Sequence, residues 1–149
     1  MCGICGEVRF DGRDVREADL LAMRDALRHR GPDDAGLFLD GPVGLGHRRL
    51  SIIDLSPLGR QPMASADGRF ITVFNGEIYN HMDIRRELAS RGVAFRGGSD
   101  TETAVNAAAV FGPEAAVSRF VGMYALALWD IRERTLYLCR DRVGVKPLY

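Results

Sequence analysis

The chain contains apolar runs of the kind that form strands, in which apolar and polar residues alternate or β-branched residues accumulate. Such runs occupy residues 4–10, 43–55 and 69–76. A further region, residues 122–141, holds two such runs on either side of a charged turn. This pattern predicts an antiparallel hairpin.

Other segments carry apolar residues three or four positions apart, which is the spacing of one helix face. Gly31 marks the predicted end of the first helix. The second has Asn80 as its predicted cap and Gly92 as its stop. In the third, Ser99 precedes Glu102 by three residues, which is the form of a capping box. The predicted helices lie within residues 16–31, 81–92, 97–112 and 113–120.

Predicted strands outnumber predicted helices, and the two kinds are grouped more than they alternate. This order favours an α+β fold with mostly antiparallel sheet over a doubly wound parallel fold. The 149 residues show no internal repeat, low-complexity tract or linker, so we expect one domain with one core.

The charge balance and the hydropathy of the sequence limit the kinds of binding partner that we expect. Twenty Lys and Arg residues balance twenty Asp and Glu residues, and no long run of one sign offers a surface to nucleic acid or anionic lipid. We therefore expect no nucleic-acid partner and favour small, neutral ligands. The chain has neither a secretory signal pattern nor an apolar run of about 18 residues, the length of a membrane span. We expect no membrane partner and a cytoplasmic location.

The chain has three cysteines, an odd number that argues against a disulfide framework. Cys2 and Cys5 form a CxxC pair, for which a zinc or redox site is the alternative use. A structural zinc site needs four ligands, and no second CxxC or HxxxH pair follows, so we predict no metal. Cys5 and Cys139 are predicted to be small residues that face the core.

Cys2 becomes the first residue of the chain when the initiator Met1 is removed, which a small side chain at this position permits. A thiol with an ordinary pKa of about 8.5 is mostly protonated at neutral pH, so a nucleophilic cysteine needs a base. An N-terminal cysteine carries one, because an α-amine has an ordinary pKa of about 7.7 to 8.0. Cys2 is therefore a candidate nucleophile that requires no histidine. The alternative is an ordinary residue at the start of a buried strand.

The segment FNGEIYN places Asn75 and Gly76 directly after a β-rich run. Asn-Gly is a strong turn signal, and one interpretation is a hairpin loop with positive φ at both residues. The other interpretation is catalytic. The Asn75 side-chain N–H and the Gly76 backbone N–H would make two donors aimed at one point, as the oxyanion of a tetrahedral intermediate requires.

Further positions suit a ligand that carries both a carboxylate and an ammonium group. Arg48 and Arg49 lie in a predicted strand, where neighbours point to opposite faces, so only one of them can enter a given pocket. Asp100 follows two glycines at a predicted helix start and would hold an ammonium group. Solvated arginines and a helix-capping aspartate are the alternatives. With Cys2 and Asn75, these residues describe a pocket that cleaves the side-chain amide of a free amino acid.

The chain contains several segments that together carry a resemblance, namely MCGICGE, RHRGPDDAG, GHRRLSIID, FNGEIYNH, GGSDTE and RDRVGVKPLY. In this order they resemble the glutaminase domain of class II glutamine amidotransferases, most of all its asparagine synthetase branch. The resemblance covers nearly the whole chain. It implies the N-terminal nucleophile hydrolase fold, an α+β four-layer αββα sandwich whose two mostly antiparallel sheets pack face to face between layers of helices.

The resemblance implies that Cys2, exposed by removal of Met1, attacks the side-chain amide of glutamine with its own α-amine as base. A thioester forms, ammonia leaves, and water releases glutamate. Asn75 and Gly76 would supply the oxyanion hole.

The resemblance also implies a binding site for the amino-acid end of glutamine. Arg49 would bind the α-carboxylate. Glu77 and Asp100 would hold the α-amine, helped by the backbone carbonyls near Ile52 and Ile53.

Residues 1–149 correspond, by this resemblance, to the glutaminase domain without its last strands and without the ATP-dependent synthetase domain that consumes the ammonia. ATP and Mg²⁺ are expected only in that domain, and this chain is expected to need no cofactor. The expected partners are L-glutamine and a synthetase domain or subunit, with a second copy of the chain as a further candidate. Two alternatives stay open: an amidotransferase of the same branch with another carboxylate acceptor, and a non-catalytic fragment that binds glutamine or a partner.

Overall fold

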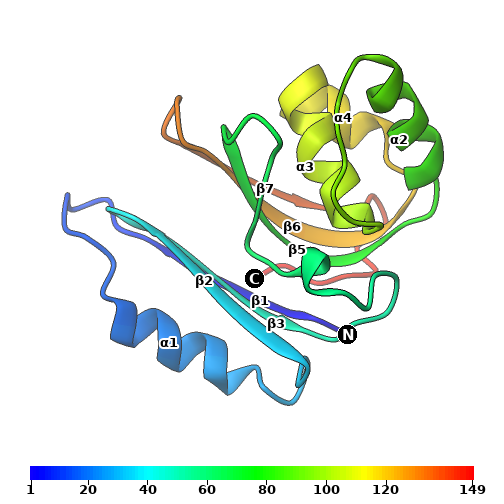
Figure 1. Ribbon diagram of the computed structural model, residues 1–149. Helices are drawn as coiled ribbons and strands as arrows, with labels where there is room; N and C mark the ends of the chain where they lie inside the picture. The colour runs from blue at the N-terminus through cyan, green and yellow to red at the C-terminus, as the bar shows by residue number, and fades with distance from the viewer.

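Two antiparallel sheets form the centre of the fold, and helices cover both outer faces (Figure 1). The computed structural model describes all 149 residues. In chain order the elements are β1 Gly3–Val8, α1 Glu17–Ala26, β2 Asp34–Asp40, β3 Val43–Arg49, the short 3₁₀ helix Pro57–Gly59, β4 Met63–Ala64, β5 Phe70–Ile78, α2 His81–Ser90, α3 Asp100–Phe111, α4 Pro113–Arg119, β6 Gly122–Asp130 and β7 Thr135–Arg140. Helix α1 covers one sheet, and α2, α3 and α4 gather on the far face of the other. The α+β, four-layer prediction is confirmed.

The first sheet has the strand order β1-β3-β2 and the second the order β4-β5-β6-β7, with every pair antiparallel. Because successive residues of a strand face opposite sides, each sheet offers one apolar face to the space between the sheets. Leu45 of β3 packs there with Ile71 and Val73 of β5. The opposite face of β5 presents Phe70 and Phe74 to the helices.

Two predicted elements end earlier than the sequence pattern indicated. Helix α1 ends at Ala26 rather than at Gly31. Turn hydrogen bonds follow the helix, such as that from the Arg30 N–H to the Leu27 carbonyl, and Gly31 then lies against the backbone of Arg48, where no Cβ atom would fit. Strand β3 ends at Arg49 instead of continuing to residue 55, because its partner strands contribute no residue beyond that point.

The structure adds strand β2, which the sequence pattern did not reveal, and it removes a predicted turn. Asn75 and Gly76 lie inside β5, paired with Ala125 and Tyr124 of β6, and neither residue has positive φ. The hairpin-loop interpretation of this Asn-Gly pair is therefore wrong. Pairing with β6 continues through both residues to Ile78, and this tertiary pairing overrides the local turn preference.

The helix caps agree with the sequence in one case and differ in another. The Ser99 hydroxyl accepts the Glu102 N–H at 3.2 Å, so the Ser99 half of the predicted capping box is confirmed. The Glu102 carboxylate instead accepts the N–H groups of Arg96 and Gly97, so the reciprocal half is absent. Asn80 precedes α2 but makes no cap bond to it, because its side chain binds the backbone of Arg119, the last residue of α4, and of Val121. The predicted hairpin is present as β6 and β7. None of the helices combines the length and the apolar surface needed to cross a bilayer.

Candidate active site

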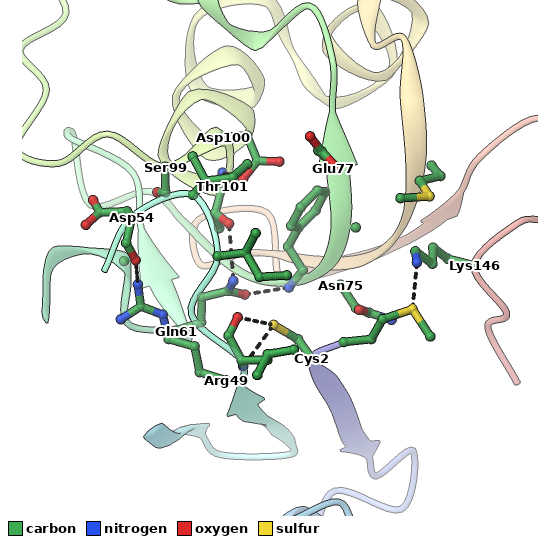
Figure 2. A pocket seen from close by; sticks show the side chains of 18 residues that line it. Cys2, Arg49, Asp54, Gln61, Asn75, Glu77, Ser99, Asp100, Thr101 and Lys146 are labelled. Carbon is green, nitrogen blue, oxygen red and sulfur yellow. Dashed lines mark hydrogen bonds between the residues drawn. The ribbon is translucent and has the colours of Figure 1, made fainter. Parts of the chain in front are cut away.

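A cavity of about 120 Å³ opens where the ends of the two sheets meet the start of α3 (Figure 2). Its walls come from the N-terminus, the loop after β3, the end of β5, the start of α3 and a segment near the C-terminus. Every residue to which the resemblance gave a role lines this one cavity: Cys2, Arg49, Ile52, Ile53, Asn75, Gly76, Glu77 and Asp100. The structure therefore brings together residues that lie far apart in the sequence.

Cys2 lies directly before β1, and its sulfur faces the cavity (Figure 2). The backbone N–H of Leu50, just beyond β3, donates to Cys2 Sγ at 3.5 Å. The carbonyl oxygen of Cys2 accepts a hydrogen bond from Arg30 Nε at 3.1 Å. These two contacts fix the half-buried thiol between the first sheet and the loop that follows it.

Met1 precedes Cys2 and forms part of the cavity wall. Lys146 Nζ contacts Met1 Sδ at 2.8 Å, and the Lys146 side chain is buried. With Met1 attached, the nitrogen of Cys2 belongs to a peptide bond and cannot act as a base.

Arg49 and Arg48 occupy opposite faces of β3, as the alternation of a strand predicts. The Arg49 guanidinium donates to the carbonyl oxygens of Asp54 and Ser56, the latter at 2.8 Å, and forms part of the cavity wall. Arg48 instead faces α1, where its Nη1 lies 3.9 Å from Asp25. Of these two arginines, only Arg49 therefore offers its cation to a ligand in the cavity.

The loop after β3 forms one wall of the cavity, and Asp54 holds it in shape. The Asp54 carboxylate accepts the N–H groups of Ser56 and Gly98, each at 2.8 Å. The hydrogen bond from the Ser56 hydroxyl is the main reason why the pKa of Asp54 lies below its ordinary value. Ile52 and Ile53 line the cavity although their side chains are largely exposed to solvent.

The end of β5 contributes two kinds of hydrogen-bond donor. The N–H and C=O of Phe70 bind Ser65, on the side of β5 where β4 lies. Backbone N–H groups of successive strand residues point to alternate edges of the strand. Gly76 is six positions after Phe70, so its N–H points to the same edge as that of Phe70. Strand β4 ends before that point, and Gly76 lines the cavity. The buried Asn75 side chain lies on the face between the sheets and lines the cavity as well.

Asp100 begins α3 and is only 4% exposed. Its Oδ2 accepts the Ile78 N–H at 3.0 Å, and its Oδ1 accepts the Thr101 N–H at 2.9 Å. Burial raises the pKa of Asp100 above its ordinary value, and these hydrogen bonds oppose the shift only in part. Glu77 lines the same cavity with an exposed side chain. The Arg49 cation, together with the Glu77 and Asp100 carboxylates, suits a ligand with the charges of a free amino acid.

The two cysteines of the CxxC segment do not share a site. Cys2 faces the cavity, whereas Cys5 packs against Gly46 and the α1 residue Arg24 on the other face of the first sheet. Burial raises the pKa of the Cys5 thiol to about 11. No group of three or more His, Cys, Asp and Glu side chains is arranged to hold a metal ion. None of the three histidines lines the cavity.

The structure also places residues in the cavity wall that the sequence analysis did not assign. Leu50 contributes a backbone N–H, which no sequence pattern identifies. Gln61, from the loop before β4, and Thr101, from the first turn of α3, meet side chain to side chain. Lys146 belongs to the segment RDRVGVKPLY, which marked the resemblance but suggested no role for this side chain.

Comparison with known proteins gives relatives over the whole chain. Residues 1–149 match the family described as the glutamine amidotransferase domain. The chain is 40% identical over 152 residues to the glutamine-hydrolysing asparagine synthetase 3 of Bacillus subtilis (strain 168), covering 100% of this chain and 24% of that protein. For asparagine synthetase 1 of the same strain the identity is 44%, with the same coverage. For asparagine synthetase 1 of Arabidopsis thaliana it is 35%, covering 100% of this chain and 25% of the relative. The chain thus spans about a quarter of the length of these relatives.

Among solved structures, the glutamine phosphoribosylpyrophosphate amidotransferase of B. subtilis, complexed with ADP and GMP, matches with a TM-score of 0.77. The match covers 97% of this chain and 38% of the other, at 18% sequence identity, so it bears on the fold alone. It confirms the fold that the resemblance implied. Together with the family match over residues 1–149, it shows that the chain belongs to the glutamine amidotransferase domain family.

Proposed function

We propose that this domain hydrolyses L-glutamine to glutamate and ammonia, and that the ammonia passes to an asparagine synthetase-type domain or subunit. The observation that supports this most strongly is the meeting of the Cys2 thiol, the Arg49 cation and the Asp100 carboxylate in one small cavity. The relatives named above carry the matching segment, and their names specify glutamine hydrolysis and asparagine synthesis.

Glutamine binding follows from the charges of the cavity. The α-carboxylate pairs with the Arg49 guanidinium, which the carbonyls of Asp54 and Ser56 already hold in position. The α-ammonium pairs with Asp100 and Glu77. The side-chain amide then extends from these anchors toward Cys2 Sγ, which faces the same cavity.

The first chemical step requires a free α-amine on Cys2, and therefore the removal of Met1. This amine accepts the thiol proton, and Sγ forms a bond to the amide carbon of glutamine. The carbonyl π electrons move to oxygen, which becomes an oxyanion. The Gly76 N–H and the Asn75 side-chain N–H stabilise that charge, an effect worth about 3–4 kcal/mol for a single well-placed donor.

The second step collapses the tetrahedral intermediate. The protonated α-amine returns its proton to the amide nitrogen, the C–N bond breaks, and ammonia leaves a thioester on Cys2. Water then gives a proton to the α-amine and adds to the thioester carbon, and the thiol leaves with that proton. Glutamine and water are thus converted to glutamate and ammonia, with Cys2 regenerated.

No step above uses ATP or Mg²⁺, which we assign to the synthetase part of the longer relatives. The reaction needs a reduced thiol, and all three cysteines are unpaired. This supports a cytoplasmic location, where thiols are kept reduced.

The decisive experiment measures glutamate formation by a preparation whose N-terminus has been determined by mass spectrometry. We expect Met1 to be absent and glutamate to form. Cys2→Ala should abolish the reaction, and Cys2→Ser, which keeps the size and polarity but is a poorer nucleophile, should lower it by orders of magnitude. Glutamine binding without any glutamate would favour the binding-fragment alternative. Full activity with Met1 attached would contradict the assigned base.

The alternative in which another carboxylate accepts the ammonia leaves every step above unchanged. Aspartate, ATP and Mg²⁺ supplied with glutamine to the full-length protein test it. We expect asparagine as the product, in proportion to the glutamate formed.

A further inference from the structure

The open edge of β5 is held by side chains instead of by a neighbouring strand. Strand β4 pairs with this edge only at Thr72 and Ile71. The peptide groups of Phe74, Gly76 and Ile78 lie further along the same edge, beyond the end of β4. Buried peptide groups need hydrogen-bond partners, so residues from elsewhere in the chain must supply them.

Gln61 supplies the partner for the Phe74 N–H. Its Oε1 accepts that N–H at 2.6 Å, and its Nε2 donates to Thr101 Oγ1 at 3.2 Å. Both Gln61 and Thr101 are buried. Because a backbone N–H can only donate, the amide of Gln61 has one orientation here, with its oxygen toward β5 and its nitrogen toward α3.

His47 supplies the partner for the Phe74 carbonyl. Its Nε2 lies 3.3 Å from that oxygen, and the side chain is fully buried between the sheets. Burial lowers the pKa of His47 to about 4, so the imidazole is neutral at pH 7. A carbonyl only accepts, so the single proton of the ring sits on Nε2 and Nδ1 is left without a partner.

The N–H groups of Gly76 and Ile78 come next along this edge of β5. Asp100 Oδ2 binds the N–H of Ile78, so a side chain holds this peptide too. The N–H of Gly76 lies between the N–H groups of Phe74 and Ile78 and faces the cavity. The backbone is thus held at Phe74 and at Ile78, and the Gly76 N–H between them remains available to a ligand.

We infer that Gln61 and His47 are positioning residues for the oxyanion hole. They hold the backbone N–H and the backbone C=O of Phe74, which belong to two consecutive peptide groups. Asn75 and Gly76 follow Phe74 directly, so the position of both oxyanion donors depends on how the Phe74 backbone is held. The inference rests on the proposed glutamine hydrolysis and adds to it the residues that set the geometry of its transition-state contacts.

A loose oxyanion hole has a specific kinetic signature. The oxyanion exists only in the transition state and the intermediate, whereas Arg49 binds glutamine in the ground state as well. Loss of the Gln61 contacts should therefore lower kcat and leave KM close to that of the parent. We expect a fall in kcat of about 10- to 100-fold, less than or equal to the loss of a direct donor.

The experiment compares variants of the processed, active protein. Gln61→Met keeps the length of the side chain and removes both hydrogen bonds. Thr101→Val removes only the acceptor of Gln61 Nε2, and Thr101→Ser restores a hydroxyl at the same place. Thr103→Val is the matched control, because it replaces a buried hydroxyl of the same helix that has no hydrogen-bond partner. Thermal unfolding of each variant reports whether it is folded.

We expect kcat to fall strongly for Gln61→Met and several-fold for Thr101→Val, and to stay near the parent value for Thr101→Ser and Thr103→Val. His47→Leu should lower kcat, and His47→Gln, whose amide nitrogen can replace Nε2, should recover part of the loss. If Gln61→Met does not fold, the comparison of Thr101→Val with Thr103→Val decides.

Two failures have different meanings. A parent protein that is folded and processed but forms no glutamate refutes the proposed function, and this inference with it. An active parent whose Gln61→Met and Thr101→Val variants keep kcat within twofold, or change KM alone, refutes this inference and leaves the proposed function standing.

Discussion

Two adjacent arginines show how much the chemistry of this site depends on a single strand position. Arg49 lies in the cavity wall, with its guanidinium held by carbonyls of the following loop. Arg48 lies on the other face of β3, near Asp25 of α1. Gly59 packs against the Arg49 guanidinium, and a Cβ atom there would overlap Nη2, so the position of this cation is tightly fixed.

Substitution by lysine should therefore affect the KM for glutamine at Arg49 and not at Arg48. Arg49→Lys keeps the charge but loses the planar fork that can bind carbonyls and a carboxylate together, so we expect the KM for glutamine to rise by about tenfold or more. Arg48→Lys should leave KM unchanged. Steady-state kinetics of glutamate formation measure both, and equal effects of the two substitutions would contradict the assignment of Arg49.

The raised pKa of Asp100 predicts a pH dependence of glutamine binding. Burial favours the neutral carboxylic acid, so Asp100 stays protonated to a higher pH than an exposed aspartate. The ionised form is the one that binds an ammonium group. We therefore expect KM to fall as the pH rises through this pKa and then to level off.

Measurement of KM between about pH 4 and pH 8 tests this expectation against the ordinary aspartate pKa of about 3.9. Asp100→Asn should have a higher KM at neutral pH and should lose the acid-side dependence. A parent KM that stays constant over the whole range would contradict the role of Asp100.

At the scale of the elements, the pairing of β5 with β6 determines what Gly76 can be. A Cβ atom at this position would overlap the Met123 carbonyl oxygen and the backbone of Tyr124. We expect Gly76→Ala to lower the free energy of unfolding by about 1–3 kcal/mol, because the two strands must separate locally. Glutamate formation should fall as well, since the Gly76 N–H moves with the strand.

Urea unfolding of the parent and of Gly76→Ala measures the stability change. Glu77→Ala is the matched control on the same strand, and its exposed side chain predicts a change within about 0.5 kcal/mol. Equal stability of parent and Gly76→Ala would show that β5 and β6 tolerate a side chain at this point.

The same elements show which parts of the molecule the sequence could predict. The cap of α3 is a contact between Ser99 and Glu102, three residues apart, so a short motif was sufficient. The hairpin of β6 and β7 is local in the same sense. The Asn-Gly pair was ambiguous because its conformation is decided by β6, nearly fifty residues later. Contacts of this range leave no periodic pattern in the sequence.

The residues of the candidate site also fall into two groups, those that the sequence could predict and those that it could not. The residues with chemical motifs, such as Cys2 and Asp100, were named from the sequence, and the structure places them in one cavity. The residues that hold the backbone were missed. Gln61 binds Phe74 from thirteen positions away and His47 from twenty-seven. Each contact joins a side chain to a backbone group. Every residue has such backbone groups, so the sequence does not indicate which one a side chain will bind.

At the scale of the whole molecule, a polar contact joins the two sheets at the end away from the cavity. The carboxylate of Asp40, at the end of β2, accepts hydrogen bonds from Trp129 Nε1 at 2.8 Å and from Arg134 Nη1 at 2.6 Å. Burial acts to raise the pKa of Asp40, but these hydrogen bonds outweigh it and hold the pKa below its ordinary value. Ionised Asp40 therefore stabilises the packing of the sheets.

This shift predicts how stability depends on pH. A carboxyl group whose pKa is lower in the folded state contributes stability above its unfolded pKa of about 3.9, and that contribution is lost as the pH falls through the folded value. We expect Asp40→Asn to unfold at a lower urea concentration than the parent at pH 7, and the difference to shrink at about pH 3.

The fluorescence of Trp129, the single tryptophan, reports this transition directly. Asp83→Asn provides the control, because Asp83 is an exposed carboxylate on α2 whose partner is the neighbouring Arg86. Its unfolding midpoint should stay near that of the parent at both pH values. A difference between Asp40→Asn and the parent that stays the same at both pH values would contradict the role of the ionised carboxylate.

Met1 in the cavity wall, bonded to the nitrogen of Cys2, has a consequence for timing. Under the proposed mechanism a newly synthesised chain is an inert precursor, comparable to a zymogen, and an aminopeptidase switches it on by removing one residue. Under this mechanism the chain hydrolyses no glutamine until Met1 has been removed. The same feature gives a practical rule for the bench: an affinity tag belongs at the other terminus, because a blocked first residue yields a folded protein with no base at its nucleophile.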